Sequence, residues 1–187
     1  MKRSHYWELK RKSIRHYDEI AGGYDDQYAD EQIQKYTIAL TAVNACSCDY
    51  MLDLGCGTGL FIKTVTGLGG YMIAVDSSKK MIQEANLKHG KKAFFLCADA
   101  DYLPFRDQIF NDVFVFTLFQ NMPDPKITIK EIRRVTKTEA KVVVTLLKRA
   151  QSNAMAQNLL NTAGLNVIQF IDKNELKDYV AICELFR

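Results

Sequence analysis

Residues 52–61 read LDLGCGTGLF, and along this stretch an apolar run gives way to a loop with glycine at every second position. The segment YMLDLG (residues 50–55) has the short apolar pattern of a buried β-strand. The segment that follows, GLFIKTVTGLG (residues 59–69), has the spacing of a helix closed by Gly67. A strand, a glycine-rich turn and a helix in this order predict the start of a βα sheet.

The rest of the chain continues this alternation of short apolar runs and amphipathic segments. Further strands are predicted at residues 71–76, 92–99, 111–119 and 141–148, helices at 77–90, 124–137 and 152–164, and a final antiparallel strand pair at 165–171 and 177–186. Right-handed βαβ crossovers then give an α/β, Rossmann-like sheet that is mostly parallel. We expect one domain spanning residues 1–187, with a core at 49–187 and an N-terminal helical cap at 1–48.

Two helices are expected in the cap, at residues 6–21 and 25–45, separated by Gly22-Gly23. The second helix is predicted to turn four side chains inward, those of Tyr28, Ile33, Tyr36 and Leu40. Basic residues concentrate in 1–16 and acidic ones in 17–31, which could guide an anionic substrate, although a solvated helix surface is the commoner meaning.

Composition excludes several classes of protein. The 187 residues carry a net charge of +3, which argues for neither nucleic acid nor membrane, and no apolar run is long enough to span a bilayer. The basic N-terminus lacks a following apolar stretch, so we expect no signal peptide and a cytoplasmic, reducing location. Cys46 and Cys48 resemble half a metal site, but no second pair stands at ligand spacing, so no metal is expected.

Acidic residues end three consecutive predicted strands. Asp53 closes the first, Asp76 the second and Asp99 the third. Because ligands of parallel sheets bind at the carboxyl ends of strands, three carboxylates there predict a site that accepts hydrogen bonds from hydroxyl or amino groups. Asp76 lies about twenty residues past the start of the glycine loop, which suits ribose.

The loop itself distinguishes between cofactors. Gly55, Gly57 and Gly59 do not have the G-x-G-x-x-G spacing of dinucleotide binders, and Asp53 would repel a pyrophosphate. A nucleoside with a positive end suits the same loop, and S-adenosylmethionine carries an ammonium and a sulfonium but no phosphate. A nucleotide- or NAD-dependent oxidoreductase is the alternative that this spacing disfavours.

These residues together resemble the class I S-adenosylmethionine-dependent methyltransferases, particularly small members similar to the ubiquinone/menaquinone biosynthesis enzymes. The resemblance rests on YDEIAGGYDDQY (17–28), LDLGCGTG (52–59), AVDSSKKMI (74–82), ADADYLPFRDQIFNDVFV (98–115) and LFQNMPDPKITIKEIRRV (118–135). It implies a seven-stranded sheet and a methyl-transfer reaction whose product is S-adenosylhomocysteine. The cofactor-binding residues that it implies, together with those argued above, are Tyr24, Asp53, Gly55, Cys56, Gly57, Gly59, Asp76, Ser77, Met81, Asp99, Ala100 and Phe116.

Within that set the resemblance assigns Asp76 to the ribose, Ser77 to a place beside the adenine and Asp99 to the adenine amino group. The backbone N–H of Ala100 would face the ring, and Tyr24 would close over the methionine end. Cys56 is interpreted as a small residue whose backbone meets the ligand. Phe116 also belongs to the expected wall of the acceptor site.

The methyl acceptor is not identified by the sequence. Gln120-Asn121 stands where many relatives carry two histidines, and none of His5, His16 and His89 is a convincing general base. The Asn/Asp-Pro-Pro-aromatic motif of nitrogen methylation is absent, and KTEAKVVV (137–144) lacks the family's Gly-Gly turn, a change expected to alter that turn alone. We expect a small-molecule or RNA acceptor and allow for an activating protein subunit. A non-catalytic cofactor-binding subunit of a larger complex is a further alternative.

Overall fold

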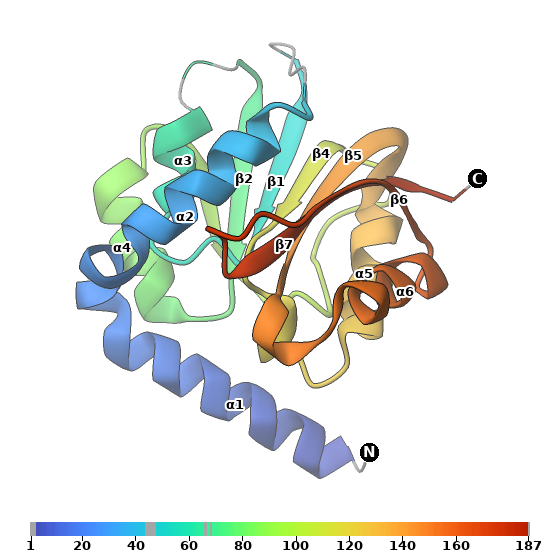
Figure 1. Cartoon of the computed structure of the whole chain (residues 1–187). Helices are drawn as coiled ribbons and strands as arrows, with labels where there is room; N and C mark the ends of the chain where they lie inside the picture. Colours follow the sequence, from blue (N-terminus) through green and yellow to red (C-terminus); the bar gives the residue numbers. More distant parts are fainter. Residues whose placement is uncertain (1–2, 44–47, 66, 68, 187) are drawn as a thin grey trace.

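The structure is a computed structural model that describes residues 3–43, 48–65, 67 and 69–186 (Figure 1). Its sheet has seven strands in the order β3-β2-β1-β4-β5-β7-β6. The strands are β1 (Tyr50–Leu54), β2 (Tyr71–Asp76), β3 (Phe94–Cys97), β4 (Phe110–Val115), β5 (Thr136–Leu147), β6 (Leu165–Ile171) and β7 (Asp178–Leu185). The first five run parallel, and β7 lies antiparallel between β5 and β6. The predicted α/β class and the antiparallel C-terminal pair are confirmed.

Helices cover both faces of this sheet. They are α1 (Arg3–Ile20), α2 (Tyr24–Leu40), α3 (Leu60–Val65), α4 (Lys79–His89), α5 (Pro125–Val135) and α6 (Asn153–Thr162), with short 3₁₀ turns at Ala21–Gly23, Phe119–Asn121 and Lys148–Ala150. Alternate residues of β4 serve opposite faces: Val113 and Val115 pack with α5 and α6, and Phe114 packs with α2 and α3. Burial on both faces is the reason these strands read as continuous apolar runs.

Local capping explains where several helices begin. Ser78 accepts a hydrogen bond from the Met81 N–H at the start of α4. Asp124 caps α5 in the same way, with Pro125 as the first helical residue. Because β1 to β5 run parallel, the strand-to-helix connections, and with them the predicted site residues, lie at one edge of the sheet. In Figure 1, α1 crosses that edge.

The inward face of α2 differs from the prediction. Ile33 is 48% exposed, whereas Gln32, Lys35, Tyr36 and Ala39 are buried. The prediction was correct for Tyr36 and wrong for Ile33, because the periodicity of apolar residues could not anticipate that a lysine would be buried. Lys35 forms an ion pair with Asp178 at the start of β7, and this partner comes from the far end of the chain.

The connection between α5 and β5 also differs. The strand starts at Thr136 rather than at residue 141, directly after the last residue of the helix, and the β4–β5 pairing shifts register between Phe110 and Asp112. Residues 137–140, which precede the predicted strand and lack Gly-Gly, belong to β5. The predicted strand 111–119 ends earlier, at Val115, where the chain turns toward the site.

Two exclusions can be stated for the part of the chain that the structure describes. No helix in it is both long enough and apolar enough to cross a membrane. No group of three or more His, Cys, Asp or Glu side chains in it could hold a metal ion. Cys48 is a free, exposed thiol, and Cys46 lies outside the described residues.

Candidate functional site

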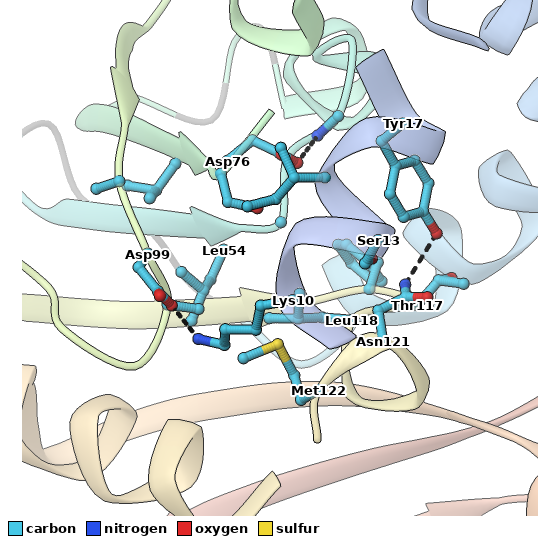
Figure 2. Close-up of a pocket in the computed structure, with 18 of the residues that line it drawn as sticks. Lys10, Ser13, Tyr17, Leu54, Asp76, Asp99, Thr117, Leu118, Asn121 and Met122 are labelled. Carbon is cyan, nitrogen blue, oxygen red and sulfur yellow. Dashed lines mark hydrogen bonds and ion pairs between the residues drawn. The ribbon is translucent and has the colours of Figure 1, made fainter. Parts of the chain in front are cut away.

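A pocket of about 740 Å³, partly open to solvent, lies at the carboxyl ends of β1, β2, β3 and β4 (Figure 2). We call it the principal pocket. Its floor comes from the residues that end these strands, and its roof from Lys10, Ser13, Ile14 and Tyr17 of α1. Since the strand order places β4 beside β1, the pocket extends from β3 at one end to β4 at the other.

Eight of the twelve predicted cofactor-binding residues line this pocket: Tyr24, Gly55, Gly57, Asp76, Ser77, Asp99, Ala100 and Phe116. Asp53 and Cys56 line a second cavity of about 290 Å³, here called the small cavity, which shares Tyr24, Gly55, Gly57 and Phe116 with the first. Gly59 and Met81 line neither. Both lie just behind the pocket, where Met81 is fully buried and Gly59 packs against α4.

The glycine loop needs its glycines for conformation and for space. Gly55 and Gly57 have φ of +81° and +54°, in the left-handed region that favours glycine. A Cβ on Gly55 would lie 3.2 Å from Cδ1 of Leu118, which is three residues past the end of β4, so the loop has little room for a side chain here. The loop is thereby folded so that the Gly57 N–H donates to Asp76 Oδ2 at 3.0 Å.

Asp76 is a preorganised acceptor at the end of β2. Besides Gly57, the Ser78 N–H donates to its Oδ1 at 2.8 Å. Burial nevertheless raises the pKa of Asp76, and these N–H groups offset that effect only in part. Carboxylate oxygens have further lone pairs, so hydroxyl groups of a ligand in the pocket can add to this network.

Asp53 has a buried oxygen without a hydrogen-bond partner in the part of the chain that the structure describes. It is 2% exposed, and its Oδ2 has no hydrogen-bond partner among the described residues. Burial, and secondarily the nearby Asp76, raises the pKa of Asp53 to about 8. The Gln32 Oε1 on the same small cavity is likewise buried without a partner. Two unpartnered acceptors on one cavity suit a cationic donor such as an ammonium group.

Cys56 sits between these groups without being reactive. Burial raises the pKa of its thiol well above the ordinary value, so the nucleophilic thiolate is disfavoured. The side chain is 8% exposed, and its backbone N–H donates to Val75 O at 3.0 Å. A redox or nucleophilic role for Cys56 therefore has no support in this geometry.

Thr117, which follows β4, is a pocket residue that the sequence did not single out. Its φ of +54° is strained for a β-branched residue. Its N–H donates to Thr145 Oγ1 at 2.7 Å, and its Oγ1 accepts from both Lys35 Nζ and Gln32 Nε2 at 3.2 Å. The buried ion pair of Lys35 thus supports the pocket at its β4 end.

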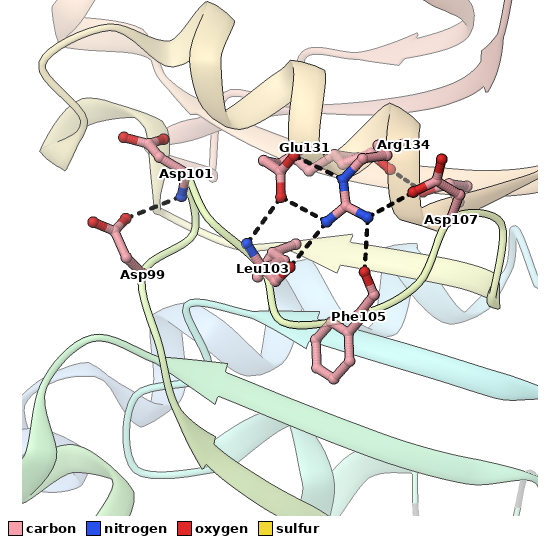
Figure 3. Close-up of polar contacts among 9 residues, drawn as sticks. Asp99, Asp101, Leu103, Phe105, Asp107, Glu131 and Arg134 are labelled. Atoms are coloured by element: carbon pink, nitrogen blue, oxygen red, sulfur yellow. Dashed lines mark hydrogen bonds and ion pairs between the residues drawn. The ribbon is translucent and has the colours of Figure 1, made fainter.

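The loop after β3, which carries Asp99 and Ala100, is tied to α5 by Arg134 (Figure 3). The guanidinium donates to Leu103 O at 2.9 Å and to Phe105 O at 2.7 Å, and it pairs with Glu131 at 2.8 Å. Glu131 in turn accepts from the Leu103 N–H at 2.9 Å. The fork geometry of arginine matches this set of acceptors and holds the loop in place before any ligand arrives.

The roof is attached at both ends of the pocket (Figure 2). Lys10 forms an ion pair with Asp99, and Tyr17 accepts a hydrogen bond from Asn121 Nδ2 at 2.8 Å. The sequence interpretation treated Lys10 as one member of a basic run. Its spacing from Ile14 and Tyr17 places it on one helical face with them, which is a signal that could have identified it as inward-facing.

The sequence matches the family described as "Methyltransferase domain" over residues 52–144. An uncharacterized protein of Methanocaldococcus jannaschii is 26% identical over 83% of this chain and 60% of its own length. A demethylmenaquinone methyltransferase of Thermobifida fusca is 31% identical over 68% of this chain and 58% of its own. A malonyl-[acyl-carrier protein] O-methyltransferase of Hamiltonella defensa also matches, over 42% of its length. The chain spans about half the length of these curated relatives.

Solved structures share the fold over nearly the whole chain. DhpI in complex with SAH superposes with a TM-score of 0.80 at 21% identity, covering 95% of this chain and 97% of its own. A Haloferax volcanii methyltransferase, solved in complex with the Trm112 methyltransferase activator, has a TM-score of 0.79 at 20% identity and covers 91% and 98%. At these identities the likeness establishes the architecture.

Proposed function

Because this chain carries the methyltransferase domain of the class I S-adenosylmethionine-dependent family, we propose that it binds S-adenosylmethionine in the principal pocket and transfers the methyl group to an acceptor. The observation that carries the proposal is the buried Asp53 oxygen without a partner, on a small cavity that opens beside the glycine loop. An ammonium group there would satisfy that oxygen and favour the ionised form of the carboxyl.

The strand order supports one orientation of the cofactor. Asp99 and Ala100 after β3 would hold the adenine, with Asp76 and Ser77 after β2 holding the ribose and the adjoining edge of the base. The glycine loop after β1 and Tyr24 would hold the methionine, with its ammonium toward Asp53. Gly59 and Met81 would support this site from behind, since neither lines a cavity.

The acceptor would then lie over the end of β4, beside Phe116, Thr117 and Leu118. S-adenosylmethionine supplies an electrophilic methyl group and a neutral thioether leaving group. In an in-line displacement, the acceptor lone pair forms the new bond to carbon while the electrons of the carbon–sulfur bond leave with sulfur. The task of the pocket residues is to orient both partners and exclude water, and the α1 roof covers the reacting centre.

No histidine lines the principal pocket among the described residues, and its ionisable side chains are Lys10, Tyr17, Tyr24, Asp76 and Asp99. We therefore favour an acceptor whose lone pair is already available near neutral pH. A small molecule suits a pocket that α1 partly covers. The exposed basic residues Arg11, Lys12 and Arg15 on the outer side of α1 keep an RNA acceptor in consideration.

Calorimetry tests the proposal directly. The protein is expected to bind S-adenosylhomocysteine with micromolar affinity and not to bind NAD. Asp76→Ala should abolish that binding, while Asp30→Ala, which removes an exposed aspartate of α2, should leave it unchanged. Binding of NAD in preference to S-adenosylhomocysteine would favour the oxidoreductase alternative.

Methyl transfer is tested separately, with labelled S-adenosylmethionine and fractions of cell RNA, protein and small molecules. The Haloferax relative is paired with an activator protein, so each fraction is assayed with and without cell extract. Label in one fraction, lost in Asp76→Ala, would identify the acceptor class. Tight cofactor binding without transfer to any fraction would favour a non-catalytic binding subunit.

A further inference from the structure

A lysine of the roof helix is buried against the acidic loop at the adenine end of the pocket. Lys10 is 5% exposed, and its Nζ forms ion pairs with both Asp99 and Asp101. The rings of Tyr6 and Trp7 lie 5.5 and 5.7 Å from the same nitrogen, within the range of cation–π attraction. A lysine so enclosed has a defined position, unlike its exposed neighbours Arg11 and Lys12.

Asp101 and Asp99 differ in their burial and in their contacts, and therefore in their roles. Asp101 is 2% exposed and anchored, because Thr128 Oγ1 donates to its Oδ1 at 2.5 Å and Tyr6 donates to its Oδ2. Asp99 lines the pocket, and its side chain is 26% exposed. Asp101 therefore holds Lys10 in place, and Lys10 is available to act on Asp99.

Only one oxygen of Asp99 is engaged in these contacts. Lys10 Nζ and the Asp101 N–H, at 3.0 Å, both donate to Oδ1. Occupying Oδ1 from two directions fixes the rotation of the carboxylate and leaves Oδ2 to accept from a ligand. Without the lysine, Asp99 would lose its counter-charge while facing a second carboxylate two residues away, and its side chain would be free to turn toward solvent.

We propose that Lys10 is a positioning residue for base selection: it orients Asp99 so that the pocket accepts a 6-aminopurine and rejects a 6-oxopurine. The inference rests on the proposed function. A carboxylate accepts hydrogen bonds and does not donate them, so it pairs with an amino group and repels a carbonyl oxygen. Because Lys10 belongs to α1, recognition of the base is coupled to seating of the roof helix over the pocket.

The test compares S-adenosylhomocysteine with S-inosylhomocysteine by calorimetry on the full chain. The second ligand has a 6-oxo group in place of the 6-amino group and, as a consequence, a proton on N1. The wild type is expected to prefer the adenine ligand about 10- to 100-fold, as the loss of a hydrogen bond to a charged group implies. Lys10→Met should reduce that preference to within about threefold of unity, and Lys10→Arg should restore most of it. Lys12→Met, on the exposed side of the same helix, is the matched control and should keep the wild-type ratio.

The ratio separates positioning from mere stability. If Lys10 only stabilises the fold, its loss weakens the binding of both ligands equally. The ratio of the two affinities then stays at the wild-type value, which overturns the inference. Lys10→Gln is measured in parallel, so that a misfolded methionine variant does not remove the test. Failure of the wild type to bind S-adenosylhomocysteine would refute the proposed function and this inference together, whereas retained binding with an unchanged ratio in the variants refutes the inference alone.

Discussion

Asp53→Asn is expected to make the ligand-free protein lose less stability than the wild type as the pH rises from about 5 to about 7. The pKa of Asp53 is about 8 in the folded protein, against an ordinary 3.8, chiefly because the side chain is buried. Over this interval the folded state holds a proton that the unfolded state has released. Unfolding is therefore favoured as the pH rises, and the free energy of unfolding falls by about 1.4 kcal/mol per pH unit from this one group.

The expected wild-type loss from Asp53 between those two pH values is about 2–3 kcal/mol. Asparagine has nearly the same shape and cannot ionise, so this contribution disappears in the variant. Urea titrations at several pH values measure it for both proteins. The two proteins are compared by the slope of the free energy of unfolding against pH. A difference that is the same at every pH reports how the new amide packs, and does not bear on the ionisation of Asp53. Parallel slopes for the two proteins would refute the argument that burial holds Asp53 protonated.

A companion measurement connects this group to the ligand. If an ammonium group binds beside Asp53, the carboxyl must release its proton, so the heat of S-adenosylhomocysteine binding near pH 6 should depend on the ionisation enthalpy of the buffer. The variant should bind more weakly and show no such dependence from this site. A wild-type heat that is independent of buffer would place the ammonium elsewhere.

Three further changes test the surroundings of the pocket by urea unfolding. Lys35→Met should lower the free energy of unfolding by about 3–5 kcal/mol, because Asp178 would stay buried without its ion-pair partner; a loss under about 1 kcal/mol would contradict this. Arg134→Met should cost about 1–2 kcal/mol, since two carbonyl groups of the loop after β3 lose a partly exposed donor, and Arg134→Lys should recover only part of it. Gly59→Ala should lower the free energy of unfolding by about 1–3 kcal/mol, because φ is +80° there and the new Cβ would lie 3.0 Å from a side-chain carbon of α4. An unchanged urea midpoint would contradict this and would mean that α4 shifts to make room.

Much of the architecture could be predicted from the sequence because the interactions that determine it are local. Strand periodicity, the glycines of the loop and the caps at Ser78 and Asp124 act within a few residues, so the alternation of strands and helices could be predicted. The carboxylates Asp76 and Asp99 could be placed for the same reason, since each simply follows a strand. Their gathering in one pocket then follows from parallel pairing.

What the chain did not reveal depends on partners far apart in sequence. Ile33 had the right spacing to face inward, yet it is exposed and Lys35 lies on the buried face of α2. Lys35 can be buried there because Asp178, more than a hundred residues away, supplies its counter-charge. Thr117 has an unremarkable local sequence and acquires its left-handed conformation from neighbours on α2 and β5.

The sequence by itself determined the sheet, the glycine loop and the acids at the strand ends, because backbone geometry and turn chemistry are short-range. The tertiary structure alone decided which of those acids are paired, which are left without a partner and that Lys35 is buried. Asp53 became an unsatisfied acceptor and Asp99 an oriented one only when helices from elsewhere in the chain closed over them. Burial and counter-charge are properties of the assembled packing, and a single segment does not contain them.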